Sequence, residues 1–347
     1  MSLRTTLLAA LGLALGSASL ARADDAAADV WHDLSVTRGS FTLLSENDKY
    51  FAGTDRHYTN GFKLLWLGET TLHRSPAFLQ AVAKYIPTLR GIESQQRYKA
   101  GLALTQEIFT PTNTDATALL PDDRPYAGWL HASLIAQAQE KDGTLLRIVE
   151  LSLGVVGPSA LGEAAQNGWH DVIHVPHAQG WANQLHDEPA LMLSWERRYR
   201  LYTWRWETRP VFDVIGRWRL TLGNVHTHAA GGFRARLGWN LPPDFGADLI
   251  RPCGGSMANA RSKAGFSAHA FLSAETRAVA RNIFLDGNTW RHSHAVKKLP
   301  VMADLSAGLV VAFPRFQLTY TQDYRTKEFR TQVHRDVFGS LALTTFY

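Results

Sequence analysis

The chain has 347 residues, of which 45% are hydrophobic and 19% are charged, and its formal net charge at pH 7 is +5. The basic residues form no run interleaved with aromatic residues, so the composition argues against a nucleic-acid-binding protein. Cys253 is the single cysteine, which excludes an internal disulfide.

The first 23 residues have the pattern of a secretory signal peptide. Arg4 precedes an apolar run from Leu7 to Leu15, and Ala21-Arg22-Ala23 provides a small-x-small cleavage site. The apolar run is shorter than the roughly 18 to 20 residues of a membrane-spanning helix. We therefore expect residues 1–23 to be cleaved on export and residues 24–347 to form a single domain.

Residues 24–347 alternate apolar and polar side chains, with the period of a β-strand, over most of their length. A soluble β-fold would show the same alternation, but several segments reach the ~9–11 residues that a tilted membrane-spanning strand needs. Tryptophans gather near the segment ends, as in the aromatic girdles of membrane barrels. The final residues Leu341, Leu343, Thr345 and Tyr347 also resemble the terminal strand of bacterial outer-membrane barrels. The predicted fold is therefore all-β, a transmembrane antiparallel β-barrel of the bacterial outer membrane.

We expect about twelve strands, an even number as in bacterial barrels. Asp142-Gly143 and Pro314-Arg315 are typical of tight turns between neighbouring strands. The stretch from Asn240 to Ser262 is the least regular, and it contains either a long loop or a misplaced strand boundary. The expected strands are 38–47, 57–68, 97–109, 127–138, 144–156, 189–201, 205–217, 225–239, 264–284, 297–311, 316–325 and 334–347.

If the N-terminus starts on the periplasmic side, connections from odd to even strands are extracellular. Four polar segments then share the extracellular rim: Asn47-Asp48, Thr59-Asn60, Asp122-Asp123-Arg124, and the long segment from Gly157 to Glu188. Within the long segment, residues 160–172 predict a short helix. Such a helix in an extracellular loop could place His170 against the barrel wall, facing Asp48.

The residue pattern at this rim suits metal-assisted ester hydrolysis. The chain has no G-x-S-x-G, H-E-x-x-H or C-x-x-C motif, so neither an α/β-hydrolase serine nor a zinc site of those types is supported. Asn47 and Asp48 offer the hard oxygen ligands that Ca²⁺ prefers, and a loop histidine could deprotonate a water molecule. From the residues alone, His170, His174 and His177 are equal candidates for that base.

The segment from Ser45 to Gly61 resembles the N-terminal signature of the LpxR-type lipid A 3′-O-deacylases. The resemblance implies that Asn47 and Asp48 belong to the active site and bind the metal, that Thr59 is a further site residue, and that His170 is the general base. It also implies a Ca²⁺-dependent esterase that removes the 3′-linked acyloxyacyl chain of lipid A, the membrane anchor of lipopolysaccharide. The expected partners are lipid A and outer-membrane lipids, with no nucleic acid, and we expect a monomer.

The chain departs from the family at positions that concern binding of the phosphorylated sugar. Asp115, Ala116 and Thr117 stand where a Lys-Arg pair is found, and Pro176 stands where an acid follows the base. Arg124 is a candidate for binding a lipid phosphate, although a rim salt bridge explains it equally well.

Plainer structural roles and other functions compete with these assignments. Asn47-Asp48 could cap a turn and Thr59 could be an ordinary strand residue. The alternative functions are an outer-membrane phospholipase with a Ser-His site and a non-enzymatic pore or adhesin barrel.

Overall fold

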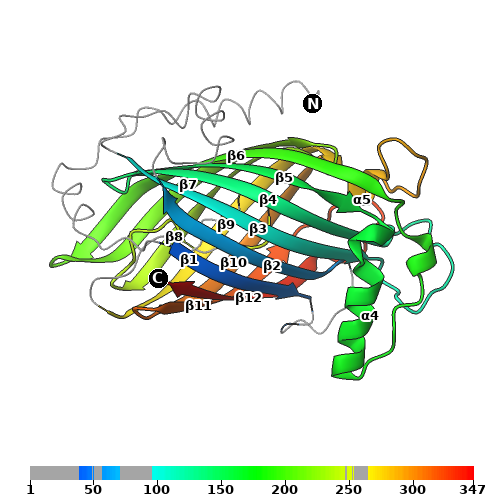
Figure 1. Ribbon diagram of the computed structural model, residues 1–347, viewed down its shortest axis with the longest axis horizontal. Coiled ribbons are helices and arrows are strands. Elements are labelled where there is room, and N and C mark those ends of the chain that lie inside the picture. The colour runs from blue at the N-terminus through cyan, green and yellow to red at the C-terminus, as the bar shows by residue number, and fades with distance from the viewer. Residues whose placement is uncertain are drawn as a thin grey trace.

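The computed structural model describes residues 39–48, 50, 57–70, 96–246, 248–251, 253 and 265–347. They form a closed antiparallel barrel in which each strand pairs with its neighbours in sequence and the first pairs with the last (Figure 1). The predicted signal peptide, residues 1–23, and residues 51–56 of the N-terminal signature lie outside the described residues. The strands are β1 (Gly39–Asn47), β2 (His57–Thr70), β3 (Gln96–Thr110), β4 (Ala127–Glu140), β5 (Leu145–Val156), β6 (Glu188–Trp206), β7 (Arg209–Gly223), β8 (His226–Trp239), β9 (Ser267–Asn282), β10 (Val301–Ala312), β11 (Phe316–Arg325) and β12 (Asp336–Phe346).

The closed barrel of twelve strands confirms the predicted fold, and most strand ends lie within a few residues of their predicted positions. The turn between β6 and β7 is the main difference, because it lies at 207–208 rather than near residues 202–204. Alternation continues unbroken through this hairpin, so the sequence pattern does not mark its tip. The strand predicted to reach residue 284 ends at Asn282, whose side chain accepts a hydrogen bond from the Phe284 amide and caps the helix α5 (Ile283–Asp286).

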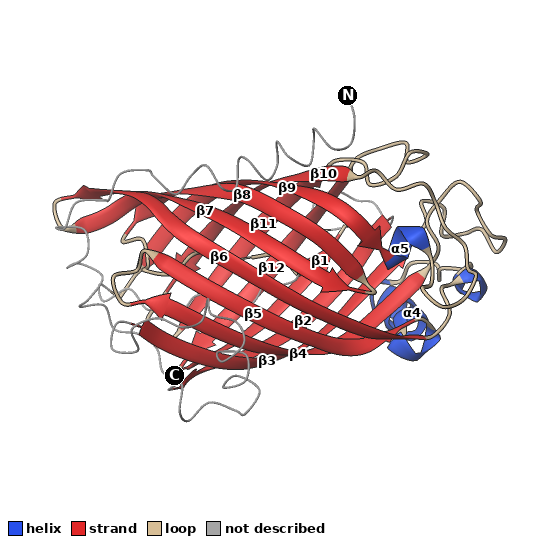
Figure 2. Cartoon of the chain, turned by 90° about the horizontal axis from the view of Figure 1, so that it is seen from above, coloured by secondary structure: helices blue, strands red, loops and turns tan. Residues whose placement is uncertain are grey.

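The two ends of the barrel differ in their connections. At one end, tight turns join β4 to β5, β6 to β7 and β10 to β11. The other end carries the helices η4 (Pro158–Ala160), α4 (Gly162–Ile173), η5 (Trp181–Asn183) and α5, as Figure 2 shows. Outer-membrane barrels have short periplasmic turns and longer extracellular loops. The end with α4 is therefore the extracellular one, and α4 confirms the predicted loop helix.

The outward side chains form an apolar surface suited to lipid. Alternation along the strands leaves Leu102, Leu153, Leu191 and Leu318 exposed on the outside, while polar side chains between them face the lumen. Near the periplasmic end the Trp66 indole nitrogen donates a hydrogen bond to the hydroxyl of the C-terminal Tyr347, at 2.5 Å. None of the helices in the described ranges is long and apolar enough to cross a membrane.

The lumen is filled by charged side chains that pair with one another. Arginines and carboxylates from β6 to β11 lie almost completely buried there, and buried charges need such pairing to offset the loss of water. Ion pairs join Arg236 to Asp213 at 2.6 Å and to Asp244, Arg217 to Asp248 at 2.9 Å, and Arg219 to Glu275 at 2.7 Å and to Glu196 at 3.1 Å.

Part of the irregular stretch after β8 folds back into the lumen, which settles it as a loop rather than a misplaced strand. We call residues 240–246, 248–251 and 253 the plug. Arg251 pairs with Glu275 at 3.0 Å, and the amide of Cys253 donates to Glu150 of β5 at 2.8 Å. The plug starts at the periplasmic end of β8, yet the amide of Ile250 donates to Glu46 near the extracellular end of β1, at 2.7 Å. The plug therefore extends through most of the barrel.

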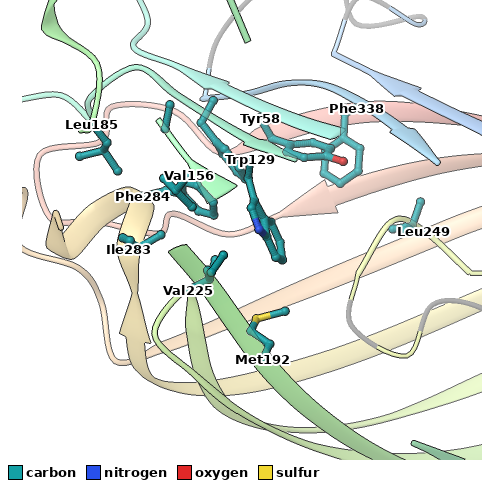
Figure 3. Packing of buried hydrophobic residues seen from close by; sticks show 13 residues of the cluster. Tyr58, Trp129, Val156, Leu185, Met192, Val225, Leu249, Ile283, Phe284 and Phe338 are labelled. Carbon is teal, nitrogen blue, oxygen red and sulfur yellow. The ribbon is translucent and has the colours of Figure 1, made fainter. Parts of the chain in front are cut away.

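Above the plug, buried apolar side chains close the extracellular end of the lumen. Phe109 and Phe284 stack with their ring centroids 3.8 Å apart, and Trp129 and Tyr58 belong to the same cluster (Figure 3). Charges, plug and aromatic layer together occupy the space that a solute would need, so the described structure argues against an open pore.

The charged lumen predicts a large effect of breaking one of its pairs. Asp213→Ala is expected to destabilise the barrel by about 3–5 kcal/mol, because the buried Arg200 and Arg236 would lose a carboxylate partner. The measurement is the temperature at which the detergent-solubilised barrel loses its heat-modifiable migration. Asp171→Ala removes the carboxylate of an exposed pair with His177 and should cost no more than about 1 kcal/mol. Equal shifts in the two variants would contradict the prediction.

Candidate functional site

The end of β1 and the start of β2 bring three of the predicted site residues together. Asn47 pairs with Asn60 across the two strands, and the amide of Asp48 donates to the carbonyl of Thr59 at 3.3 Å. Although they lie at the rim of the barrel, Asn47, Asp48 and Thr59 are all buried. A turn cap alone would leave such residues in water, so their burial indicates a more specialised role.

A β-bulge gives Thr59 its orientation. The register between β2 and β3 shifts between Tyr58 and Asn60, so Thr59 is the extra residue of β2. Tyr58 packs with the aromatic cluster of the lumen, whereas the Thr59 hydroxyl is hydrogen-bonded to the hydroxyl of Thr110, at 2.7 Å. Thr110 is two residues from Ile108, which packs against the loop helix outside the barrel. The bulge therefore turns Thr59 toward the outer wall.

Glu46 links this rim to the plug. Its carboxylate accepts hydrogen bonds from the Tyr58 hydroxyl at 2.8 Å and from the Ile250 amide at 2.7 Å, so both oxygens are held. Because Glu46 directly precedes Asn47 in the same strand, these contacts fix the backbone from which Asn47 and Asp48 project. This contact could not be predicted from the sequence, because Ile250 lies 204 positions from Glu46.

Helix α4 packs closely on the outer wall through glycine. A Cβ atom on Gly128 of β4 would lie 3.0 Å from the backbone nitrogen of Gly162, and one on Gly162 would lie 2.8 Å from the ring of Trp181. The Gln106 side chain of β3 also donates to the Ala160 carbonyl at 2.7 Å. These contacts place the helix against β3 and β4 at the extracellular end, as the sequence predicted.

His170 lies in the last turn of α4, and it is buried. Its Nδ1 is 2.7 Å from the carbonyl oxygen of Pro176. A carbonyl oxygen can only accept a hydrogen bond, so Nδ1 must carry the proton, and in the neutral ring Nε2 keeps its lone pair. This is the tautomer that a general base needs. His177 is half exposed instead, and its Nε2 is 2.6 Å from Asp171. His174 is exposed as well, so burial separates His170 from the other two candidates that the sequence left equal.

The donor set at the rim fits Ca²⁺. Among the described residues, no group of three or more His, Cys, Asp and Glu side chains could hold a metal ion, so a zinc-type site is not supported there. Ca²⁺ instead takes six to eight oxygens, drawn from carboxylates, amide and backbone carbonyls and water. The Asp48 carboxylate and the Asn47 amide belong to this class, and the backbone carbonyl of Thr59 lies next to the Asp48 amide.

Comparison with known proteins supplies the family. A family model described as outer membrane protein LpxR matches residues 7–347, nearly the whole chain. The chain belongs to the LpxR family. It is an outer-membrane protein, in agreement with its closed barrel.

A solved structure supports the same fold. LpxR from Salmonella typhimurium is similar to this chain with a TM-score of 0.71 and 17% identity, over 89% of this chain and 100% of that chain. The β domain of the Bordetella autotransporter BrkA (TM-score 0.44, 11% identity, 90% and 99% coverage) and the translocator domain of NalP from Neisseria meningitidis (0.40, 9%, 99% and 97%) are more distant. No curated protein matches the chain.

At two of the positions that depart from the LpxR family pattern, the backbone carbonyl makes a hydrogen bond. Pro176 has no acid side chain, but its backbone carbonyl occupies the position of an acceptor for His170. The main chain thus holds the ring of His170 in place. The backbone carbonyl of Thr117 likewise accepts a hydrogen bond from the Asn183 side chain, at 2.8 Å. This bond holds the connection between β3 and β4, but Asp115, Ala116 and Thr117 bring no positive charge to it.

Arg124 faces away from the outer wall. Its guanidinium pairs with Glu328 at 2.5 Å and lies over the rings of Phe109 and Phe329. This arrangement is the salt bridge that the sequence allowed as an alternative to phosphate binding. Burial alone would raise the pKa of Glu328, but Arg124 holds it down to about 2. The pair therefore adds stability above the ordinary carboxyl pKa of 4.5, and that stability is lost as the pH falls from there to about 2.

The sequence analysis did not predict one chain of hydrogen-bonded side chains at the rim. His57, at the start of β2, has its Nδ1 2.5 Å from Asp336 of β12 and its Nε2 3.1 Å from the Thr112 hydroxyl. Gln332 also donates to Asp336 at 3.1 Å. Because Asp336 follows His57 by 279 positions, no local motif could reveal this chain, which ties three extracellular connections together.

Proposed function

We propose that the protein is a lipid A 3′-O-deacylase, an outer-membrane esterase that removes the 3′-linked acyloxyacyl chain. Membership of the LpxR family, to whose deacylases the sequence is similar, supports this class of function. The observation that carries the proposal is the hydrogen bond from His170 to the Pro176 carbonyl, which leaves Nε2 as the basic nitrogen beside the outer wall. A lipid substrate in the outer leaflet could reach this position laterally.

The proposed reaction is hydrolysis with balanced proton transfer. Nε2 of His170 takes a proton from water, and the water oxygen attacks the ester carbonyl carbon. The bond from that carbon to the sugar 3′ oxygen then breaks, and the protonated histidine returns its proton to the leaving oxygen. The products are the free acyloxyacyl acid and a 3′-hydroxyl on the sugar. Nδ1, held by Pro176, keeps the ring oriented through both transfers.

Asn47 and Asp48 would hold the metal ion of this proposal. The chemistry that Ca²⁺ supplies at such a site is polarisation of the ester carbonyl and compensation of the negative charge on its oxygen. Thr59, whose hydroxyl is fixed by Thr110 on the same wall, would position substrate or water there.

The proposal predicts a dependence on Ca²⁺ that is tested by mass spectrometry of lipid A. Membranes containing the protein and treated with a chelator should leave lipid A intact, and added Ca²⁺ should restore the loss of one acyloxyacyl unit. Mg²⁺ should restore it less, because Mg²⁺ demands near-octahedral geometry and gives up water reluctantly. Full activity in the chelator would contradict the metal assignment while leaving the reaction itself in place.

One observation favours the phospholipase alternative. In the chain of Thr112, His57 and Asp336, a hydroxyl, an imidazole and a carboxylate follow one another as in a hydrolase triad. The Asp123 carboxylate accepts from the Thr112 amide at 2.7 Å, however, and a negative charge there would oppose an oxyanion. A fluorophosphonate probe distinguishes the two sites, since only a nucleophilic hydroxyl would be labelled.

A further inference from the structure

A basic and aromatic cluster lies on the lipid-facing side of β5, β6 and β7, away from the deacylase site. We call Arg147, Trp195, Arg197, Tyr199 and Trp218 the Arg197 cluster. Ser194, Glu196 and Arg198 of β6 are buried and face the lumen, where Glu196 and Arg198 pair with each other. Because strand side chains alternate between faces, Arg197 and its neighbours in the cluster face the lipid.

The cluster is built across three strands. Arg197 is directly opposite Arg147 of β5 and Trp218 of β7 in the strand register. The Arg197 guanidinium carbon lies 5.4 Å from the ring centroid of Trp195 and 5.9 Å from that of Trp218. These two indoles meet edge to face, with their centroids 4.6 Å apart. The two rings therefore hold the guanidinium at a fixed place on the barrel wall.

The charge of Arg197 is not neutralised within the described part of the chain. Arg147 pairs with Glu140 at 2.6 Å, whereas no carboxylate of the described residues pairs with Arg197. Its Nη1 is 3.5 Å from the Tyr199 hydroxyl, the outer limit of a hydrogen bond. Its Nε and the indole nitrogen of Trp195 are buried donors without a partner there. A cation at the edge of hydrocarbon needs an anion or water to be stable.

The position of the Arg197 cluster along the barrel indicates which leaflet of the membrane it faces. Arg147 is the third residue of β5, just after the tight turn from Lys141 to Thr144 at the end opposite α4. On β5 the cluster thus lies toward the periplasmic end. Exposed leucines such as Leu193 lie on its extracellular side, and the exposed Leu201 and Trp204 continue the wall of β6 on its periplasmic side. Aromatic girdles of this kind lie at the level of lipid headgroups. The anion available to such a wall is the phosphate of an inner-leaflet phospholipid.

We propose that the Arg197 cluster binds the phosphate of one inner-leaflet phospholipid. A planar guanidinium binds two phosphate oxygens at once, and the guanidinium of Arg197, which the rings of Trp195 and Trp218 hold on the barrel wall, supplies the donors. The acyl chains would then lie along the leucines of β5 and β6. This site is separate from the proposed deacylase site, so its test does not depend on that function.

The test is native mass spectrometry of the purified full-length barrel, with phosphatidylglycerol added to the detergent. The wild type should retain one phosphatidylglycerol molecule that Arg197→Gln loses, with an affinity lower by about tenfold or more, as for the loss of a charge-assisted hydrogen bond. Diacylglycerol with the same acyl chains should not be retained, since it lacks the phosphate. Equal retention of phosphatidylglycerol by the variant, or of diacylglycerol by the wild type, would overturn the proposal.

Two further variants serve as controls. Arg315→Gln removes the same charge from an exposed turn at the same end of the barrel and should retain the lipid. Arg197→Lys keeps the charge but loses the planar fork, so retention should be intermediate. If Arg197→Gln fails to fold, as judged by heat-modifiable migration, Arg197→Lys decides the matter, because unchanged affinity in that folded variant would refute phosphate recognition by the guanidinium.

Discussion

Asp48→Ala is expected to abolish removal of the acyloxyacyl chain while leaving the barrel folded. The carboxylate is the charged ligand that the proposal gives to the metal ion, and loss of metal-assisted charge stabilisation costs several kcal/mol. A fall in rate of about 10³-fold or more follows. Mass spectrometry of lipid A from cells expressing the variant measures this effect, with heat-modifiable migration as the check on folding.

Two variants make the Asp48 experiment specific. Asp48→Asn retains the shape of the side chain, but it removes the charge and replaces one acceptor oxygen by an NH2 donor, so it should be nearly as inactive. Asp122→Ala removes an exposed carboxylate from the same rim and should keep full activity. If Asp48→Asn is as active as the wild type, the side chain is a turn cap and the metal assignment fails.

His170→Ala is expected to reduce the turnover number by about 10²–10⁴-fold, the usual contribution of a general base. Binding of the lipid should change much less, so kcat falls and KM stays nearly constant. The measurement is the rate of acyl release from purified lipid A in mixed micelles. Loss of the imidazole also removes the contact with the Pro176 carbonyl, and the circular dichroism of the folded barrel shows whether the variant remains intact.

His177→Ala is the matched control for His170. Both residues belong to the same extracellular connection, but His177 is half exposed and pairs with Asp171. The control should retain its activity. An inactive His177→Ala with an active His170→Ala would exchange the two assignments and refute the tautomer argument.

Pro176 shows how the main chain can hold a side chain in place. The sequence has a proline here, where the family pattern has an acid. The structure supplies a backbone carbonyl 2.7 Å from Nδ1, and every residue type carries that group. Orientation of the base can thus pass from a side chain to the main chain, although a carbonyl has no charge with which to stabilise the imidazolium.

The sequence by itself determined the strands, the barrel and the end of the barrel that carries the polar motifs. These features follow from the period of two along each strand and from strand parity, which are local or additive properties. The helix containing His170 could also be predicted from the sequence, because its helix-forming residues lie within one short segment. The signature around Asn47 and Asp48 identified the site through resemblance.

Only the tertiary structure decided which residues meet. The plug contact between Ile250 and Glu46, the chain from His57 to Asp336 and the pairing of Arg124 with Glu328 join positions more than 200 residues apart. The turn at 207–208 was misplaced because alternation continues through the hairpin. Periodicity gives the face on which a side chain lies, but its partner depends on how the closed barrel brings distant strands and loops together. That closure, and not the local pattern, fixes the lumen side of Arg124, whereas the protonated nitrogen of His170 follows from its contact with the nearby Pro176 carbonyl.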